Sequence, residues 1–131
     1  MKVEEFIRLV NGKPWVNRAC NFEAMDCWGL VVLYYRHVLG IELHDVAGYE
    51  SGKDFVTCYS AESDFWADEP VARSGSIAVF YIGDQPDHVG LMLTPTKCLH
   101  ASRASGFVRI DTPLNILKSH SKVEFKRYGA I

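Results

Sequence analysis

Residues 26–40 read DCWGLVVLYYRHVLG, and this stretch carries the clearest helix signal in the chain. Asp26 is a favoured N-cap residue because its carboxylate can accept a hydrogen bond from a backbone N–H of the first turn. Two basic residues fall in the last turn, and Gly40 is a typical helix stop. We therefore predict a helix over Asp26–Leu39.

Cys27 directly follows the predicted cap. In the first helical turn, unpaired N–H groups and the helix dipole favour a thiolate, which predicts a thiol pKa one or more units below the usual value of about 8.5. The cysteine shares one apolar helix face with residues at helical spacing, which are Leu30, Val31, Tyr34 and Val38. This face should pack on a sheet and point Cys27 toward it. Position alone leaves open that Cys27 is a small buried hydrophobe, as most free cysteines are.

The other segments place helices before strands. Val3–Val10 has helical spacing and is stopped by an Asn-Gly pair, Lys13–Met25 is typical of a loop, and Ser51–Trp66 predicts a weaker helix. Short β-prone runs separated by Gly, Pro, Asp, Ser or Thr follow, and they are Ile77–Ile82, Val89–Leu93, Lys97–Ala101, Phe107–Ile110 and Val123–Tyr128. This order favours an α+β domain in which the helices pack on one face of an antiparallel sheet.

The composition excludes several functional classes. With 131 residues and 48% hydrophobic content, we expect one domain over 1–131 without a linker. The formal charge of −2 and the lack of a long basic run argue against nucleic acid as a partner. No apolar run is long enough for a membrane span. Because Glu4 and Glu5 interrupt the segment where a signal peptide needs an apolar core, we expect synthesis in the cytoplasm without a signal peptide.

Four cysteines stand at positions 20, 27, 58 and 98. An even count would fit disulfides in a secreted chain, but without a signal peptide we do not expect them. Zinc sites usually use Cys-x-x-Cys pairs, and the sequence contains none. We expect neither a metal nor another cofactor.

Two histidines are spaced as a cross-strand pair. His88 opens one predicted strand, His100 lies in the next, and the turn Thr94-Pro95-Thr96 between them predicts a hairpin in which the two fall roughly opposite each other. Gly90 leaves space beside His88 on the same strand face. One histidine can then take a proton from the Cys27 thiol while the other orients its ring. A single histidine in a strand is more often structural, so the combination with Cys27 is what favours catalysis.

These residues fall into three blocks whose order and spacing resemble the signature of the NlpC/P60 family of papain-like cysteine peptidases. The blocks are Asp26-Cys27-Trp28-Gly29-Leu30, His88-Val89-Gly90 and Leu99-His100-Ala101. The similarity runs from about Gly12 to Tyr128 and includes a Gly-x-Pro-aromatic segment before the cysteine. Within the family, the Asp-Cys-Trp-Gly motif is most similar to the short phage tail-associated peptidases.

The resemblance implies a papain-like α+β fold, with N-terminal helices packed on a five- to six-stranded antiparallel sheet. It also implies a Cys-His-His triad in which Cys27 is the nucleophile, His88 the general base and His100 the orienting third member. The backbone N–H of Cys27 would contribute to the oxyanion hole. The implied substrate is a peptidoglycan stem peptide, hydrolysed at a D-γ-glutamyl to diamino-acid bond.

Further residues are assigned to the substrate side of the cleft. Asp26 would cap the helix and contact substrate. Trp15 stands where many members carry a tyrosine near the oxyanion site, although an aromatic residue of the core or rim would fit equally. Trp28 replaces a serine of many bacterial members and would narrow the cleft, and Ser102 shares the strand face of His100. Other titratable residues fit turns, helix ends or the surface and are assigned no function, among them Asp87, Asp111 and His120.

Two rival functions stay open at this point. The same fold and thiol could serve another acyl transfer, as an amidase at the glycan junction or as an acyltransferase. A catalytically silent tail-tip assembly protein could keep the fold without the activity. The phage resemblance implies tail or assembly proteins as partners, and a place in the virion tail that acts at the bacterial cell wall.

Overall fold

The computed structural model describes residues 1–43 and 65–129. The weak helix expected over Ser51–Trp66 lies outside the described residues except at its end, as do Cys58 and His44. At that end the prediction is wrong, because Trp66 begins strand β1 (Trp66–Asp68). Its side chain is only 6% exposed, and its backbone pairs with Tyr128 across the sheet, so tertiary burial decides its conformation.

The helix predicted from the Asp26 cap is confirmed. α2 covers Cys27–Tyr34 and continues as the π-helix η1 (Tyr35–Leu39), which ends at Gly40 in the left-handed conformation with φ of 70°. α1 covers Val3–Val10, as predicted. A short helix that the sequence pattern did not predict, α5 (Pro113–Leu117), follows the last residue of β5 and is capped by Thr112.

Six strands form one antiparallel sheet in the order β1-β6-β2-β3-β4-β5. Besides β1, the strands are β2 (Ile77–Ile82), β3 (Gln85–Thr94), β4 (Lys97–Ser102), β5 (Phe107–Asp111) and β6 (Lys122–Tyr128). The prediction of N-terminal helices on a five- to six-stranded antiparallel sheet is therefore confirmed. Among the described residues, no helix is long and apolar enough to cross a membrane.

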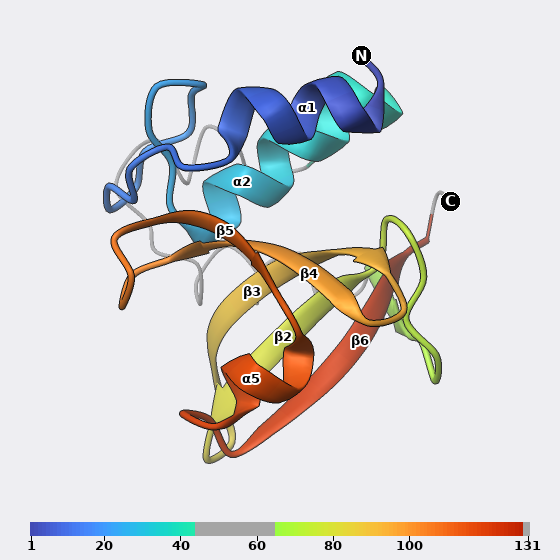
Figure 1. Cartoon of the computed structure of the whole chain (residues 1–131). Helices are drawn as coiled ribbons and strands as arrows, with labels where there is room; N and C mark the ends of the chain where they lie inside the picture. The colour runs from blue at the N-terminus through green and yellow to red at the C-terminus, as the bar shows by residue number, and fades with distance from the viewer. Residues whose placement is uncertain (44–64, 130–131) are drawn as a thin grey trace.

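The sheet is covered on both faces. Figure 1 shows α1 and α2 together on one side, where they share the larger hydrophobic core with strand residues such as Val79 and Leu91. Ile116 of α5 packs on the opposite face against Phe80 and Met92. Every residue of α2 after Cys27 is buried, and Phe6 of α1 packs on Tyr34 of this helix, with ring centroids 5.3 Å apart. The prediction of one packed face was thus incomplete.

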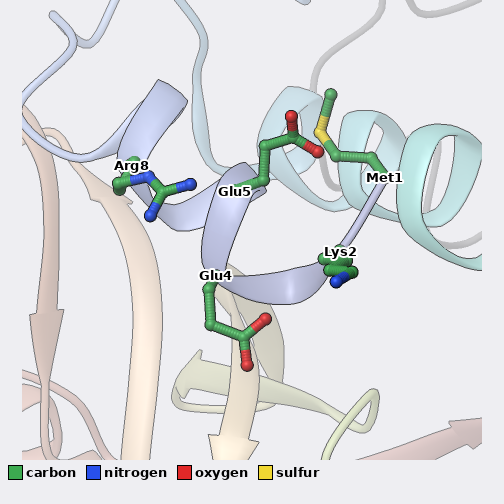
Figure 2. A pocket seen from close by; sticks show the side chains of 5 residues that line it. All are labelled: Met1, Lys2, Glu4, Glu5 and Arg8. Atoms are coloured by element: carbon green, nitrogen blue, oxygen red, sulfur yellow. The ribbon is translucent and has the colours of Figure 1, made fainter.

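The outer side of α1 remains polar. Its residues line an open hollow of about 630 Å³ (Figure 2), formed by Met1, Lys2, Glu4, Glu5 and Arg8. Glu4, Glu5 and Arg8 point outward from the helix in this view. The hollow shares no residue with the cleft described below, so α1 contributes to the site only through packing.

Candidate active site

A cleft of about 800 Å³ opens where the start of α2 meets strands β3, β4 and β5. Six of the seven site residues expected from the sequence line it, and these are Trp15, Asp26, Cys27, His88, His100 and Ser102. The remainder of the wall comes from the turn after β4, from β5 and from the segment around α5. Residues that are far apart in the sequence therefore line one cavity.

Trp28 is the exception. It does not line the cleft, and its side chain is fully buried against Trp66, with ring centroids 6.4 Å apart. The helical rotation of about 100° per residue turns Trp28 away from the cleft that its neighbour Cys27 faces. The expectation that Trp28 narrows the cleft does not fit this placement.

Asp26 holds the start of α2 in place. One carboxylate oxygen accepts a 2.9 Å hydrogen bond from the Gly29 N–H, and the other accepts a 2.8 Å bond from the Arg18 N–H. Burial raises the pKa of this carboxyl to about 6, although the hydrogen bonds from Gly29 and Arg18 work in the opposite direction. A Cβ at Gly29 would lie 2.3 Å from the Ala19 carbonyl oxygen, so the helix start fits closely against the preceding loop.

The environment of the Cys27 thiol disfavours the thiolate. Burial and then the nearby Asp26 carboxylate raise its pKa, while the backbone N–H groups of Val89 and Trp28 oppose the shift. The expectation of a lowered thiol pKa is therefore wrong, because desolvation and a like charge outweigh the helix dipole. The contribution of the Val89 N–H places the sulfur beside β3, next to His88 in sequence.

The two histidines contact each other directly. His88 Nε2 and His100 Nδ1 lie 2.9 Å apart, with ring centroids separated by 5.1 Å. Burial, followed by His100 and His120, lowers the pKa of His88 to about 3. Burial also lowers the pKa of His100 to about 4, with Asp111 opposing the shift. Both rings are therefore neutral near pH 7.

The histidines meet diagonally, in contrast to the expected arrangement. Leu91 pairs with Leu99, and this register continues to place Gly90 opposite His100, with His88 two residues further along. Gly90 makes the diagonal contact possible, because a Cβ there would lie 3.3 Å from the His100 Cβ and 2.2 Å from the Cys98 sulfur. The space that the sequence predicted beside His88 at Gly90 is therefore filled by the Cys98 sulfur and the His100 Cβ.

Residues from the last third of the chain complete the wall around the histidines. The His120 ring stacks on His88 at 6.1 Å between centroids, and its Nε2 lies 2.9 Å from Asp87 Oδ2. Asp111 Oδ2 lies 3.9 Å from His100 Nε2. The sequence pattern assigned none of these three residues a function. The signal that could have identified Asp111 is the hairpin of β4 and β5. His100 pairs with Arg109 in this hairpin, and Asp111, two residues further along β5, lies on the same face of the sheet as His100.

The cleft carries both signs of charge. Arg103 lies 5.6 Å from the centroid of the Trp15 ring, which is a cation–π arrangement, and Arg109 approaches Asp111 at 3.7 Å. Within residues 1–43 and 65–129, no group of three or more His, Cys, Asp or Glu side chains is arranged to hold a metal ion. No disulfide links Cys20, Cys27 and Cys98 to one another.

Comparison with known proteins points to one family. A family model described as the NlpC/P60 family matches residues 12–126. Among solved structures, the NlpC/p60 domain of the peptidoglycan hydrolase SagA superimposes with a TM-score of 0.65 at 16% identity, covering 95% of this chain and 93% of that one. No curated protein matches the chain.

Two further structures share the fold. An NlpC/P60 family protein from Bacillus cereus ATCC 10987 has a TM-score of 0.64 at 18% identity over 98% of this chain, which spans only 40% of that protein. An N-acetylmuramoyl-L-alanine amidase from Bacteroides uniformis ATCC 8492 has a TM-score of 0.59 at 11% identity, covering 96% of each chain. At these identities the likeness shows the fold alone.

Proposed function

The chain belongs to the NlpC/P60 family, and from that premise we propose that it is a cysteine peptidase that hydrolyses amide bonds in peptidoglycan stem peptides. The observation that carries the proposal is the 2.9 Å contact between His88 Nε2 and His100 Nδ1 in the cleft that Cys27 also lines. This contact leaves Nδ1 as the ring nitrogen of His88 that can serve the thiol.

In the proposed mechanism, Cys27 and His88 start as a neutral pair. As the sulfur attacks the scissile carbonyl carbon, the thiol proton moves to Nδ1 of His88, and the backbone N–H of Cys27 stabilises the developing oxyanion. His88 then returns this proton to the leaving amine, and the C–N bond breaks to give a thioester on Cys27. Water activated by His88 hydrolyses the thioester, which releases the acid and restores the thiol. His100 orients the base throughout.

The bond we propose is the one between D-γ-glutamate and the diamino acid of the stem. Such a segment carries carboxylates and an amine, and the cleft offers Arg103 and Arg109 beside Asp26 and Asp87. We further propose a phage or prophage tail as the setting, which the Asp-Cys-Trp-Gly motif at Asp26–Gly29 supports. The SagA domain with the same fold is titled as part of a peptidoglycan hydrolase, which is in keeping with the substrate class.

Digestion of purified peptidoglycan followed by mass spectrometry tests this function. We expect wild-type protein to release stem fragments cut after D-γ-glutamate, and Cys27→Ala and His88→Ala to release none while keeping the wild-type circular dichroism spectrum. Cys20→Ala is the matched control, since Cys20 does not line the cleft. Near wild-type release by either active-site variant would contradict the mechanism. Release of complete stems from the glycan would instead identify an amidase, the activity named for the Bacteroides uniformis protein.

A further inference from the structure

Among the residues that the structure describes, one ring nitrogen of the His88–His100 pair has no hydrogen-bond partner. His100 is 4% exposed, and its Nε2 atom is buried without a hydrogen bond to any group in residues 1–43 and 65–129. Asp111 Oδ2 lies 3.9 Å from this atom, which is beyond hydrogen-bond distance but close enough for the carboxylate charge to act on the N–H dipole of the ring. Buried polar atoms are normally paired, so this arrangement calls for an explanation.

The contact between the two rings limits where the protons can be. Only one proton can lie between His88 Nε2 and His100 Nδ1, which are 2.9 Å apart. If His88 is to accept the Cys27 proton at Nδ1, its own proton must be on Nε2, so that His100 Nδ1 accepts. A neutral His100 then carries its proton on Nε2, facing Asp111. In the opposite tautomer, a bare Nε2 faces the carboxylate, and His88 presents N–H to the thiol.

Asp111 is held in a fixed position as an anion. Its oxygens accept hydrogen bonds from the Thr112 N–H at 2.9 Å and from the Asn115 side-chain amide, which lies 2.9 Å from both oxygens. Burial acts to raise the pKa of this carboxyl, but the bonds from Asn115 and Thr112, with the Arg109 charge, leave it below the usual value. The side chain is 14% exposed, so solvent screens its field on His100 only partly.

We propose that Asp111 is a positioning residue that selects the Nε2–H tautomer of His100 and thereby keeps His88 competent as a base. The inference rests on the proposed function and adds a fourth side chain to the row Cys27, His88 and His100. Asp111 lines the same cleft, and its nearest titratable partner on the catalytic side is His100. Its carboxylate acts on the ring of His100, and its effect on the Cys27 thiol is transmitted through the rings of His100 and His88.

Nitrogen-15 NMR of the full-length protein labelled at histidine tests the tautomer without any substrate. In the wild type, we expect His100 to be protonated at Nε2 and bare at Nδ1, and Asp111→Asn to shift the population toward the Nδ1–H form. Asn115→Ala keeps the carboxylate of Asp111 but removes the side-chain amide that is hydrogen-bonded to it, so it should change the tautomer population less. A wild-type His100 protonated at Nδ1, or a tautomer population that Asp111→Asn leaves unchanged, would overturn the proposal. Either result can be read even if peptidoglycan proves not to be the substrate.

A double-mutant cycle measured by kcat distinguishes a positioning role of Asp111 from a purely structural one. We expect Asp111→Asn to lower kcat about ten- to a hundredfold with little change in KM, well below the ~10⁴-fold loss when a triad carboxylate in direct contact is replaced. In the His100→Asn background, which has no ring tautomer to select, the same substitution should have almost no further effect. An equal loss of kcat in both backgrounds would show that Asp111 only supports the fold, and would also overturn the proposal.

Discussion

Replacing Gly90 with alanine tests how the sheet sets the distance between the two histidines. Gly90 is not among the glycines with positive φ, so alanine fits its backbone and should gain about 0.4–1 kcal/mol through the unfolded state. The new methyl group, however, would lie 2.2 Å from the Cys98 sulfur and 3.3 Å from the His100 Cβ. Ordinary contacts between carbon atoms are about 3.5–4.0 Å, so the methyl carbon and the sulfur would be more than about 1 Å too close.

The size of the destabilisation by Gly90→Ala follows from the burial of Cys98. This side chain is fully buried between the strands and α5, so its sulfur can move only by shifting its neighbours. Overpacking of this kind costs about 1–3 kcal/mol, which exceeds the entropic gain. We expect Gly90→Ala to lower the free energy of unfolding by about 1–2 kcal/mol. It should also abolish most hydrolysis, because His100 must move away from the 2.9 Å contact with His88.

A double-mutant cycle measured by urea denaturation at pH 7 provides the assay. Cys98→Ala removes the clashing sulfur and by itself should cost on the order of 1 kcal/mol. The double variant should then be more stable than the sum of the single effects by at least about 1 kcal/mol. Activity should return only in part, since the 3.3 Å approach to His100 remains. Additive effects within about 0.5 kcal/mol would refute the packing argument.

Three further predictions concern the cleft. The pKa of Asp26 is raised to about 6, so its protonated form stabilises the fold below pH ~4, and this contribution of up to about 3 kcal/mol is lost as the pH rises through 6. In urea unfolding, Asp26→Asn should therefore abolish this fall in the free energy of unfolding between pH 4 and pH 7, and an unchanged fall would contradict the raised pKa. Iodoacetamide should modify Cys27 more slowly than free cysteine at pH 7, as followed by peptide mass spectrometry, and faster modification would contradict the raised thiol pKa. Arg103→Ala should cost less than about 1 kcal/mol in thermal unfolding, because its cation–π contact with Trp15 is exposed; a larger loss would show that the pair is structural.

The elements with local signals could be predicted from the sequence. The carboxylate of Asp26 caps α2, and Gly40 ends η1 with φ of 70°, because both positions need a particular residue type whatever surrounds them. The five predicted strands all form. Trp66 was assigned to a helix because its pairing with Tyr128 is a long-range contact that local spacing does not record.

The details of the site depend on register and on three-dimensional packing. Leu91 pairs with Leu99, so the β3–β4 hairpin is centred on Pro95, whereas His88 and His100 are centred on Thr94, and the two histidines expected to lie roughly opposite each other are therefore offset by two residues. Trp28 was expected in the cleft because it stands where many members of the family that the sequence resembles carry a serine. The run from Trp28 to Tyr34 is apolar on every side, which is itself the signal of a buried helix.

The surroundings of Cys27 and His88 determine how the proposed nucleophile would work. Burial raises the pKa of the Cys27 thiol and lowers the pKa of His88, so the two do not form a resting thiolate–imidazolium pair. In the proposed mechanism, the proton therefore leaves sulfur only as negative charge develops on a bound carbonyl. A neutral base works only if its lone pair faces the thiol, which makes the tautomer of His88 more important than its charge. That tautomer is set through His100, and this gives the carboxylate of Asp111, a turn residue by sequence, its proposed part in the site.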